Sequence, residues 1–133
     1  MNILGLDLGD RRIGVAISFD DLVSSLDTIV YFNREEAIKD ILEICRSQEI
    51  GKIVIGMPIG NEQSEDVVRS FANELNKIAG VPIDYEDETL TSKEAERILK
   101  DKKLNYKSEK YKQEIDRISA KIILEQYLNR GLN

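Results

Sequence analysis

The chain has 133 residues, of which 41% are apolar and 33% are charged, and its formal net charge is −6. This length and apolar content predict a single domain over residues 1–133 with its own core, and they exclude two domains of ordinary size. No run of sequence approaches the roughly 18 apolar residues of a membrane-spanning helix, so we expect no association with a membrane.

Five runs rich in Val, Ile and Leu predict β-strands, because most of them are also bounded by Gly, Pro or Asp. These strands cover residues 2–8, 12–18, 26–31, 52–57 and 81–86. Apolar residues at helical spacing predict four helices. These helices cover residues of about 34–48, 64–79, 92–102 and 109–129. The predicted order of elements is therefore βββ-α-β-α-β-α-α.

Capping patterns support the predicted helix boundaries. Asn33 precedes Glu36 by three residues and Thr91 precedes Glu94 by three residues, which is the spacing of a capping box. Gly80 stands where the second helix is expected to end, as glycine commonly does at this position.

The order of elements predicts an α/β fold. The first two strands are close enough for a hairpin, and the first three form a meander. The β-α-β connections that follow are expected to be right-handed and to place later strands beside the first. The first strand is then central and covered on both faces, which suits its unbroken apolar run. We expect a mixed five-stranded sheet with helices on both faces.

The only cysteine is Cys45, on the apolar side of the first predicted helix. A single cysteine cannot form a disulfide within the chain, so we expect a buried thiol and a protein of the reducing cytoplasm.

Charge is distributed unevenly along the chain. Residues 97–121 contain nine basic and four acidic residues, whereas the remainder contains ten basic and 21 acidic residues. This asymmetry is compatible with one edge that faces phosphates on an otherwise acidic body. It is equally compatible with an ordinary solvated surface.

Acidic residues at strand ends are the first candidates for chemistry. Asp7 stands at the end of the first strand, where a carboxylate costs folding free energy unless something pairs with it. A second acidic cluster stands where the last strand ends, and a parallel last strand would bring it to the same edge of the sheet as Asp7. The cluster consists of Asp84, Glu86, Asp87 and Glu88. The pattern alone does not select one of its four members.

Asp116, in the last helix, is the third candidate. It shares a helix face with Ser119, Ala120, Ile123 and Tyr127. The small residues one turn onward, Ser119 and Ala120, would let the helix lie close to the sheet. The alternative is an ordinary aspartate near the start of a helix.

Three converging carboxylates repel one another, and protonation or a metal ion must restore neutrality. Oxygen ligands favour Mg²⁺ or Mn²⁺ over zinc, and the absence of histidine strengthens this preference. It also excludes nucleophilic triads of the Ser-His-Asp or Cys-His type. Two such ions could activate a water and stabilise the leaving oxygen of a phosphodiester.

The sequence resembles the YqgF/RuvX family along essentially its whole length. Four motifs carry the resemblance in the family's order: residues 3–9 (ILGLDLG) with 12–16 (RIGVA), residues 55–59 (IGMPI), residues 87–96 (DETLTSKEAE), and residues 115–128 (IDRISAKIILEQYL). Members are described as pre-16S rRNA nucleases with an RNase H-like fold, and were earlier described as Holliday junction resolvases.

The resemblance implies a metal-binding and catalytic triad of Asp7, Glu88 and Asp116, with Asp87 as the fallback for Glu88. It implies hydrolysis of RNA near the 5′ end of the small-subunit ribosomal precursor, with that RNA as partner. Gly9 and Gly14 would then let the backbone approach the ligand closely.

Basic residues near these acids are the expected nucleic-acid contacts. Arg11 and Arg12 lie on the predicted hairpin turn, and Lys93 and Arg117 are nearest the acids in sequence. Thr89 stands where the family motif usually has arginine, so one expected phosphate contact is missing. The loop over residues 60–64 is also shorter than in the family, which leaves the substrate range open.

Three other functions stay open. Actin-like ATPases and sugar kinases also begin with an apolar strand, D-x-G and a hairpin, but they place nucleotide between two related domains. A non-catalytic RNA-binding protein of ribosome assembly could keep the same fold. A Holliday junction resolvase would differ only in cutting DNA. The oligomeric state is not predicted by the sequence.

Overall fold

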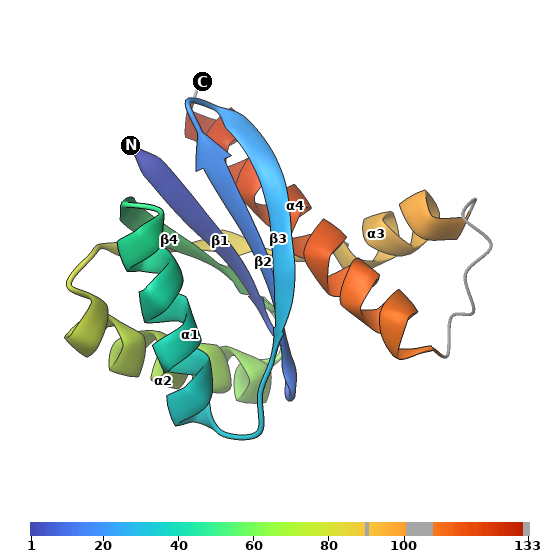
Figure 1. Ribbon diagram of the computed structural model, residues 1–133. Helices are drawn as coiled ribbons and strands as arrows, with labels where there is room; N and C mark the ends of the chain where they lie inside the picture. Colours follow the sequence, from blue (N-terminus) through green and yellow to red (C-terminus); the bar gives the residue numbers. More distant parts are fainter. Residues whose placement is uncertain (90, 101–107, 132–133) are drawn as a thin grey trace.

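The computed structural model of the protein describes residues 1–89, 91–100 and 108–131 (Figure 1). Its elements follow the predicted order. The strands are β1 (Asn2–Leu8), β2 (Arg12–Phe19), β3 (Leu22–Val30), β4 (Ile50–Met57) and β5 (Ile83–Asp87). The helices are α1 (Arg34–Ser47), α2 (Glu62–Ala79), α3 (Thr91–Leu99) and α4 (Glu109–Gly131).

The five strands form one mixed sheet in the order β3-β2-β1-β4-β5, which confirms the predicted topology. β2 is antiparallel to both β1 and β3, so the first three strands form the expected meander. β4 is parallel to both β1 and β5. β1 is therefore central, and the carboxyl ends of β1, β4 and β5 lie at the same edge of the sheet.

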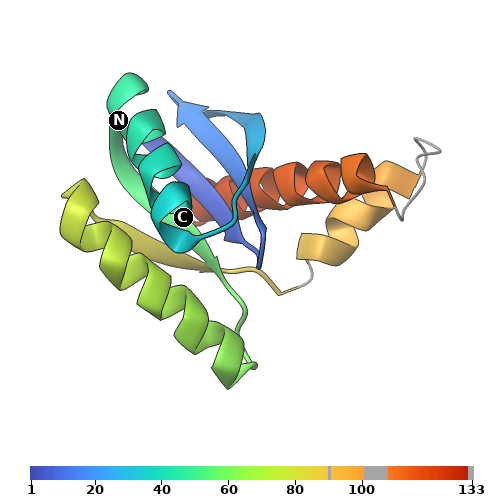
Figure 2. The ribbon, with the colours of Figure 1, turned by 60° about the horizontal axis from the view of Figure 1, so that its bottom comes forward.

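Helices cover both faces of the sheet, as predicted. The larger core lies between the sheet and the α1–α2 pair, around side chains with no exposed surface such as Leu6, Ile41 and Leu75. The smaller core lies under α4, around Val54, Ala120 and Leu124. α3 packs against α4 on the side of the sheet opposite α1 and α2 (Figure 2). The two faces together remove most aliphatic side chains from water, which is the main stabilising contribution to such a fold.

The strand β3 begins four residues earlier than the sequence predicts. Phe19 pairs with Leu22, and the two residues between them, Asp20 and Asp21, both have positive φ (48° and 73°). Positive φ at both central residues defines the type I′ hairpin turn, whose twist matches that of the flanking strands. The turn therefore extends the β2–β3 pairing to its last residue.

Helix starts also differ in detail. Asn33 caps α1 as predicted, because its side chain accepts a hydrogen bond from the Glu36 backbone N–H at 2.9 Å. Asn61 caps α2 in the same way and starts it two residues before the predicted boundary. The predicted cap at Thr91 is wrong. Thr91 is already the first helical residue, and its hydroxyl donates to the Glu88 carbonyl at 2.8 Å.

Cys45 is partly buried and packs against the larger core. Burial raises the pKa of its thiol, which is therefore a poor nucleophile. Within the described ranges, none of the helices has both the length and the apolar character needed to cross a bilayer.

Candidate active site at the carboxyl edge of the sheet

Two of the predicted acids lie where parallel strands end. Asp7 is near the carboxyl end of β1, and Glu88 directly follows β5. The backbone N–H of Glu88 donates to the carbonyl of Met57 at 3.1 Å, which ties Glu88 to the end of β4. The parallel pairing of β1, β4 and β5 thus brings two carboxylates together that are distant in the sequence.

The third acid is placed by a close approach of α4 to β2. Gly14 is the cross-strand partner of Asp7, so the two residues share a face of the sheet. A Cβ atom on Gly14 would lie 1.9 Å from the backbone oxygen of Asp116. The backbone of α4 therefore rests directly on β2, and only glycine fits there. The predicted role of Gly14 in approaching a ligand is corrected: the closely packed neighbour is the helix that carries Asp116.

Gly5 and Gly56 extend this arrangement along the same face. A Cβ atom on Gly5 would lie 3.0 Å from the Cβ of Leu124. On Gly56 it would lie 2.6 Å from the Cδ1 of Ile123 and 2.7 Å from Oε2 of Glu88. The missing side chain of Gly56 thus makes room both for α4 and for the carboxylate of Glu88.

The electrostatics of Asp7 show that the acids meet. Burial raises the pKa of Asp7 well above its ordinary value, and the negative charge of Glu88 raises it further. A hydrogen bond with Glu88 and the charge of Asp116 act in the same direction. Negative charges gathered in this way disfavour the ionised form of Asp7, so the site gains from an added positive charge.

Arg12 is the principal partner of Asp116. Its Nε donates to Oδ2 of Asp116 at 2.7 Å, and a second guanidinium nitrogen lies 3.7 Å from Glu109. Burial raises the pKa of Asp116, while the guanidinium of Arg12 opposes that rise. The predicted contact of Arg12 with phosphate stays a prediction, because in this structure the guanidinium is engaged by the carboxylate of Asp116.

The acids are suited to a hard divalent cation, although they do not yet form a complete cage. Among the described residues, no group of three or more metal-binding side chains is close enough together to hold an ion as it stands. The raised pKa of Asp7 shows that positive charge is favoured at this position, and oxygen is the ligand that Mg²⁺ and Mn²⁺ prefer. In this structure Asp116 is bound to Arg12.

The structure separates Glu88 from its fallback, Asp87. The carboxylate of Asp87 accepts hydrogen bonds from the backbone N–H and the hydroxyl of Thr89, at 2.8 and 2.5 Å. These bonds lower the pKa of Asp87. Asp87 is therefore occupied within its own loop, whereas Glu88 reaches Asp7.

The other predicted basic residues are Arg11, Lys93 and Arg117. Arg11 is exposed on the β1–β2 turn, and Lys93 is exposed on α3. Arg117 donates to Glu114 at 2.9 Å, and its Nε is buried without a hydrogen-bond partner among the described atoms. Their contacts with nucleic acid stay predictions. Residues 101–107, in the middle of the basic segment, lie outside the described part of the chain.

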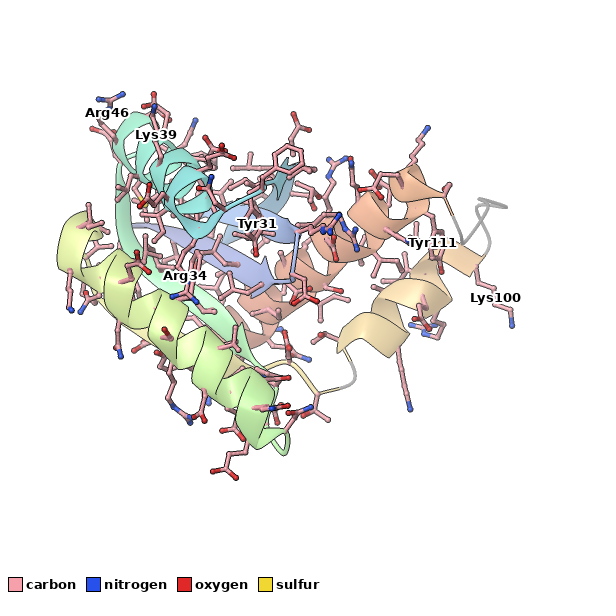
Figure 3. The ribbon with its side chains drawn as sticks, turned by 90° about the horizontal axis from the view of Figure 1, so that it is seen from below. Tyr31, Arg34, Lys39, Arg46, Lys100 and Tyr111 are labelled. Carbon is pink, nitrogen blue, oxygen red and sulfur yellow. The ribbon has the colours of Figure 1, made fainter. Side chains whose placement is uncertain are left out.

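A cavity beside the acids was not anticipated. It has a volume of about 330 Å³ and lies between the β1–β2 turn and the first turns of α1 and α2. Tyr31 and Arg34, labelled in Figure 3, contribute to its wall, and so does Glu88. Tyr31 lay at the end of a predicted strand and Arg34 at the start of a predicted helix, so neither had a signal that joined it to Glu88.

An ion pair between a buried carboxylate and an exposed guanidinium was also missed. Glu86 is 7% exposed, and its carboxylate lies 2.6 Å from the guanidinium of Arg130 near the end of α4. Because Gly56 pairs with Glu86 in register, Glu86 belongs to the sheet face covered by α4. It therefore serves to hold the end of the helix on the sheet.

Comparison with known sequences gives consistent results. Residues 1–130 match the family described as "RuvX: Holliday junction resolvase". A relative from Chloroflexus aurantiacus is 38% identical over 96% of this chain and 86% of its own length. A relative from Syntrophus aciditrophicus is 40% identical over 97% of this chain and 89% of its own length. Both carry the name "Putative pre-16S rRNA nuclease".

Solved structures confirm the expected RNase H-like fold. RuvC of Thermus thermophilus, in complex with a Holliday junction substrate, aligns with a TM-score of 0.64 at 11% identity, over 98% of this chain and 96% of RuvC. The fowlpox virus Holliday junction resolvase aligns with a TM-score of 0.54 at 12% identity, over the whole of both chains. Such low identities establish the fold and nothing about the substrate.

Proposed function

The chain belongs to the RuvX family, and from this membership we propose that residues 1–133 form one nuclease domain that hydrolyses RNA phosphodiester bonds with the help of a divalent metal. We further propose that its substrate is the precursor of the small-subunit ribosomal RNA in the cytoplasm. The names of relatives that are 38–40% identical over nearly the whole chain support the choice of RNA.

The observation that carries the proposal is the contact between Asp7 and Glu88. These two acids come from the ends of different strands, and the charges of Glu88 and Asp116 both raise the pKa of Asp7. Such a cluster lowers the stability of the fold, so it needs a functional reason. Binding of a cation is the reason best suited to three acids without a histidine.

The chain's own residues have distinct parts in this mechanism. Asp7, Glu88 and Asp116 would hold Mg²⁺ or Mn²⁺, which supplies Lewis-acid stabilisation of the charge that develops on the phosphate. Gly14 and Gly56 keep α4 and Glu88 close to Asp7. Arg12 neutralises Asp116 in this structure, and its guanidinium would be placed to contact a phosphate oxygen if a cation took over that role.

The test compares three substrates with the purified full chain: a labelled pre-16S rRNA fragment, a four-way DNA junction, and ATP. Each is incubated with Mg²⁺, with Mn²⁺, or with a chelator. We expect cleavage of the RNA fragment only with metal. The matched variants are Glu88→Gln, which should be inactive, and Asp87→Asn, which should cleave normally.

Resolution of DNA junctions is the second candidate, because the family description itself is Holliday junction resolvase. Metal-dependent cleavage of the junction without cleavage of RNA would establish it in place of the RNA nuclease. Metal-independent RNA binding without cleavage of any substrate would favour a non-catalytic assembly factor. Hydrolysis of ATP alone would favour the actin-like alternative.

A further inference from the structure

The cavity beside the acids has rigid aromatic and apolar walls. The hydroxyl of Tyr31 donates to the carbonyl of Gly9 at 2.5 Å, which fixes the ring against the β1–β2 turn. Val67, Val68 and Phe71 of α2 form an apolar side of the cavity. Unpaired bases commonly stack on exposed aromatic rings of this kind.

Arg34 is held by its neighbours within the same wall. Its guanidinium donates to Ser70 at 3.1 Å and to Glu74 at 3.2 Å, and it lies 5.7 Å from the centre of the Phe71 ring. The charge of Arg34 is thus already balanced by Glu74, while a planar guanidinium in such a position can still stack on a base.

The remaining charges of the cavity favour a neutral occupant with amino groups. Asp10 and Glu88 are the acidic side chains in the lining, and Arg34 is the lining cation. The carboxylate of Asp10 disfavours a phosphate in the cavity, and the charge of Arg34 is already paired with Glu74. Carboxylate oxygens such as those of Asp10 accept hydrogen bonds from amino groups of the kind that adenine, cytosine and guanine carry.

Glu88 also connects the cavity to the acids. The same side chain lines the cavity and shares a hydrogen bond with Asp7. Whatever occupies the cavity is therefore a direct neighbour of the proposed metal site. The volume of about 330 Å³ is at the lower end of small-molecule pockets, which suits one nucleotide and excludes a base pair.

We propose that this cavity binds a single unpaired nucleobase of the RNA strand, adjacent to the phosphodiester that is cleaved. The inference rests on the proposed nuclease function and deepens it: the enzyme would act on a strand from which one base can turn outward. An amino-bearing base would be preferred over uracil at that position.

The test measures RNA binding, separately from cleavage, with the full chain in the presence of a chelator. A short fluorescein-labelled single-stranded RNA is made in versions that each lack one base, and fluorescence anisotropy gives the affinity for each. Loss of a stacked base should weaken binding by about five- to hundredfold at one position and little elsewhere.

A pair of variants on α2 tests the place of the base. Val67 lines the cavity and Ile78 does not, yet their exposed fractions are 58% and 59%. Val67→Trp should fill the cavity and remove the sensitivity to the missing base, whereas Ile78→Trp should keep it. Thermal melting of both variants checks that each is folded. A 2-aminopurine at the sensitive position supplies a second readout in the unmodified protein, because its fluorescence should be quenched against Tyr31.

The outcomes are separable. RNA binding that is insensitive to every base, or that stays base-sensitive in a folded Val67→Trp variant, would overturn the inference while the nuclease proposal stands. An absence of RNA binding in the unmodified protein would overturn the inference, and an absence of metal-dependent RNA cleavage would overturn the nuclease proposal. Loss of base sensitivity in Val67→Trp alone, together with quenching of 2-aminopurine, is the expected result.

Discussion

Replacing Asp7 with asparagine should separate the stability of the fold from its activity. The change removes an ionisable group from a partly buried pair of acids and leaves the shape of the side chain almost unchanged. The new amide can donate a hydrogen bond to the carboxylate of Glu88. We expect the metal-free variant to be more stable than the parent protein and to lose at least about a hundredfold in metal-dependent cleavage.

The size of the gain follows from the raised pKa of Asp7. A carboxyl group whose pKa is higher in the folded state stabilises the fold only while it is protonated. That contribution is complete below the unfolded value near 3.8 and is lost as the pH rises through the folded pKa. At neutral pH, the free energy of unfolding is therefore lower by about 1.4 kcal/mol for each pH unit by which the folded pKa of Asp7 exceeds its unfolded pKa. Asparagine removes this cost, and each kcal/mol recovered raises the melting temperature by about 3–6 °C.

The assay is thermal unfolding at several pH values in a chelator, with cleavage of the RNA fragment measured in parallel. The stability of the parent protein should approach that of Asp7→Asn as the pH falls towards 4. Added Mg²⁺ should raise the melting temperature of the parent and not that of the variant. Full cleavage by Asp7→Asn, or a melting temperature below the parent's at neutral pH, would refute this account of the acids.

Three further outcomes follow from other contacts. Glu88→Gln should abolish cleavage, whereas Asp87→Asn should cleave at nearly the parent rate. Asp87→Asn should also be slightly less stable, because it weakens the hydrogen bonds to Thr89 in the following loop. A cleavage time course on both variants tests the difference in activity. Gly14→Ala should cost at least about 3 kcal/mol and reduce cleavage, measured by urea unfolding and activity, since α4 must move away from β2. Arg130→Ala should lower the free energy of unfolding by about 1–3 kcal/mol at neutral pH, because it leaves the buried carboxylate of Glu86 unpaired. The loss should be smaller near pH 4, because the pKa of Glu86 is raised and the group is protonated there. Equal losses of stability at both pH values would contradict this account.

The topology was predictable because it follows from patterns that are local in the sequence. An unbroken apolar run in β1, a short β1–β2 connection and two β-α-β units determine the order of the strands. The start of β3 was not predictable on the same basis. Two aspartates with positive φ make the turn at residues 20 and 21, and Asp-Asp is a much weaker hairpin signal than Asn-Gly.

The candidate site was predictable only in part. Parallel strand ends bring Asp7 near the acidic cluster, but the alternation of side chains stops where β5 ends. The choice between Asp87 and Glu88 therefore needed the family resemblance and then the observed turn at Thr89. The pairing of Arg12 with Asp116 joins residues 104 positions apart, and it depends on where α4 lies along the sheet.

The position of α4 depends in turn on Gly14. Glycines that share one face of the strands could have indicated in the sequence that a backbone packs closely there. Gly5 and Gly14 each lie on the sheet face under α4, and so does Gly56. Glycine in a central strand often marks a close backbone approach. The sequence analysis assigned that approach to a ligand, since no pattern states which neighbour fills the space.

The contact between Gly14 and α4 joins main chain to main chain, so no side chain sets its length. Exchanges among leucine, isoleucine and valine in the surrounding core should therefore change the spacing of Asp7 and Asp116 less than any side chain added at Gly14. Mutational tolerance in this fold should be lowest at the glycines under α4, Gly14 and Gly56, and higher in the aliphatic interior around them. Homologues could diverge widely in their cores while the alignment of their acids stays the same.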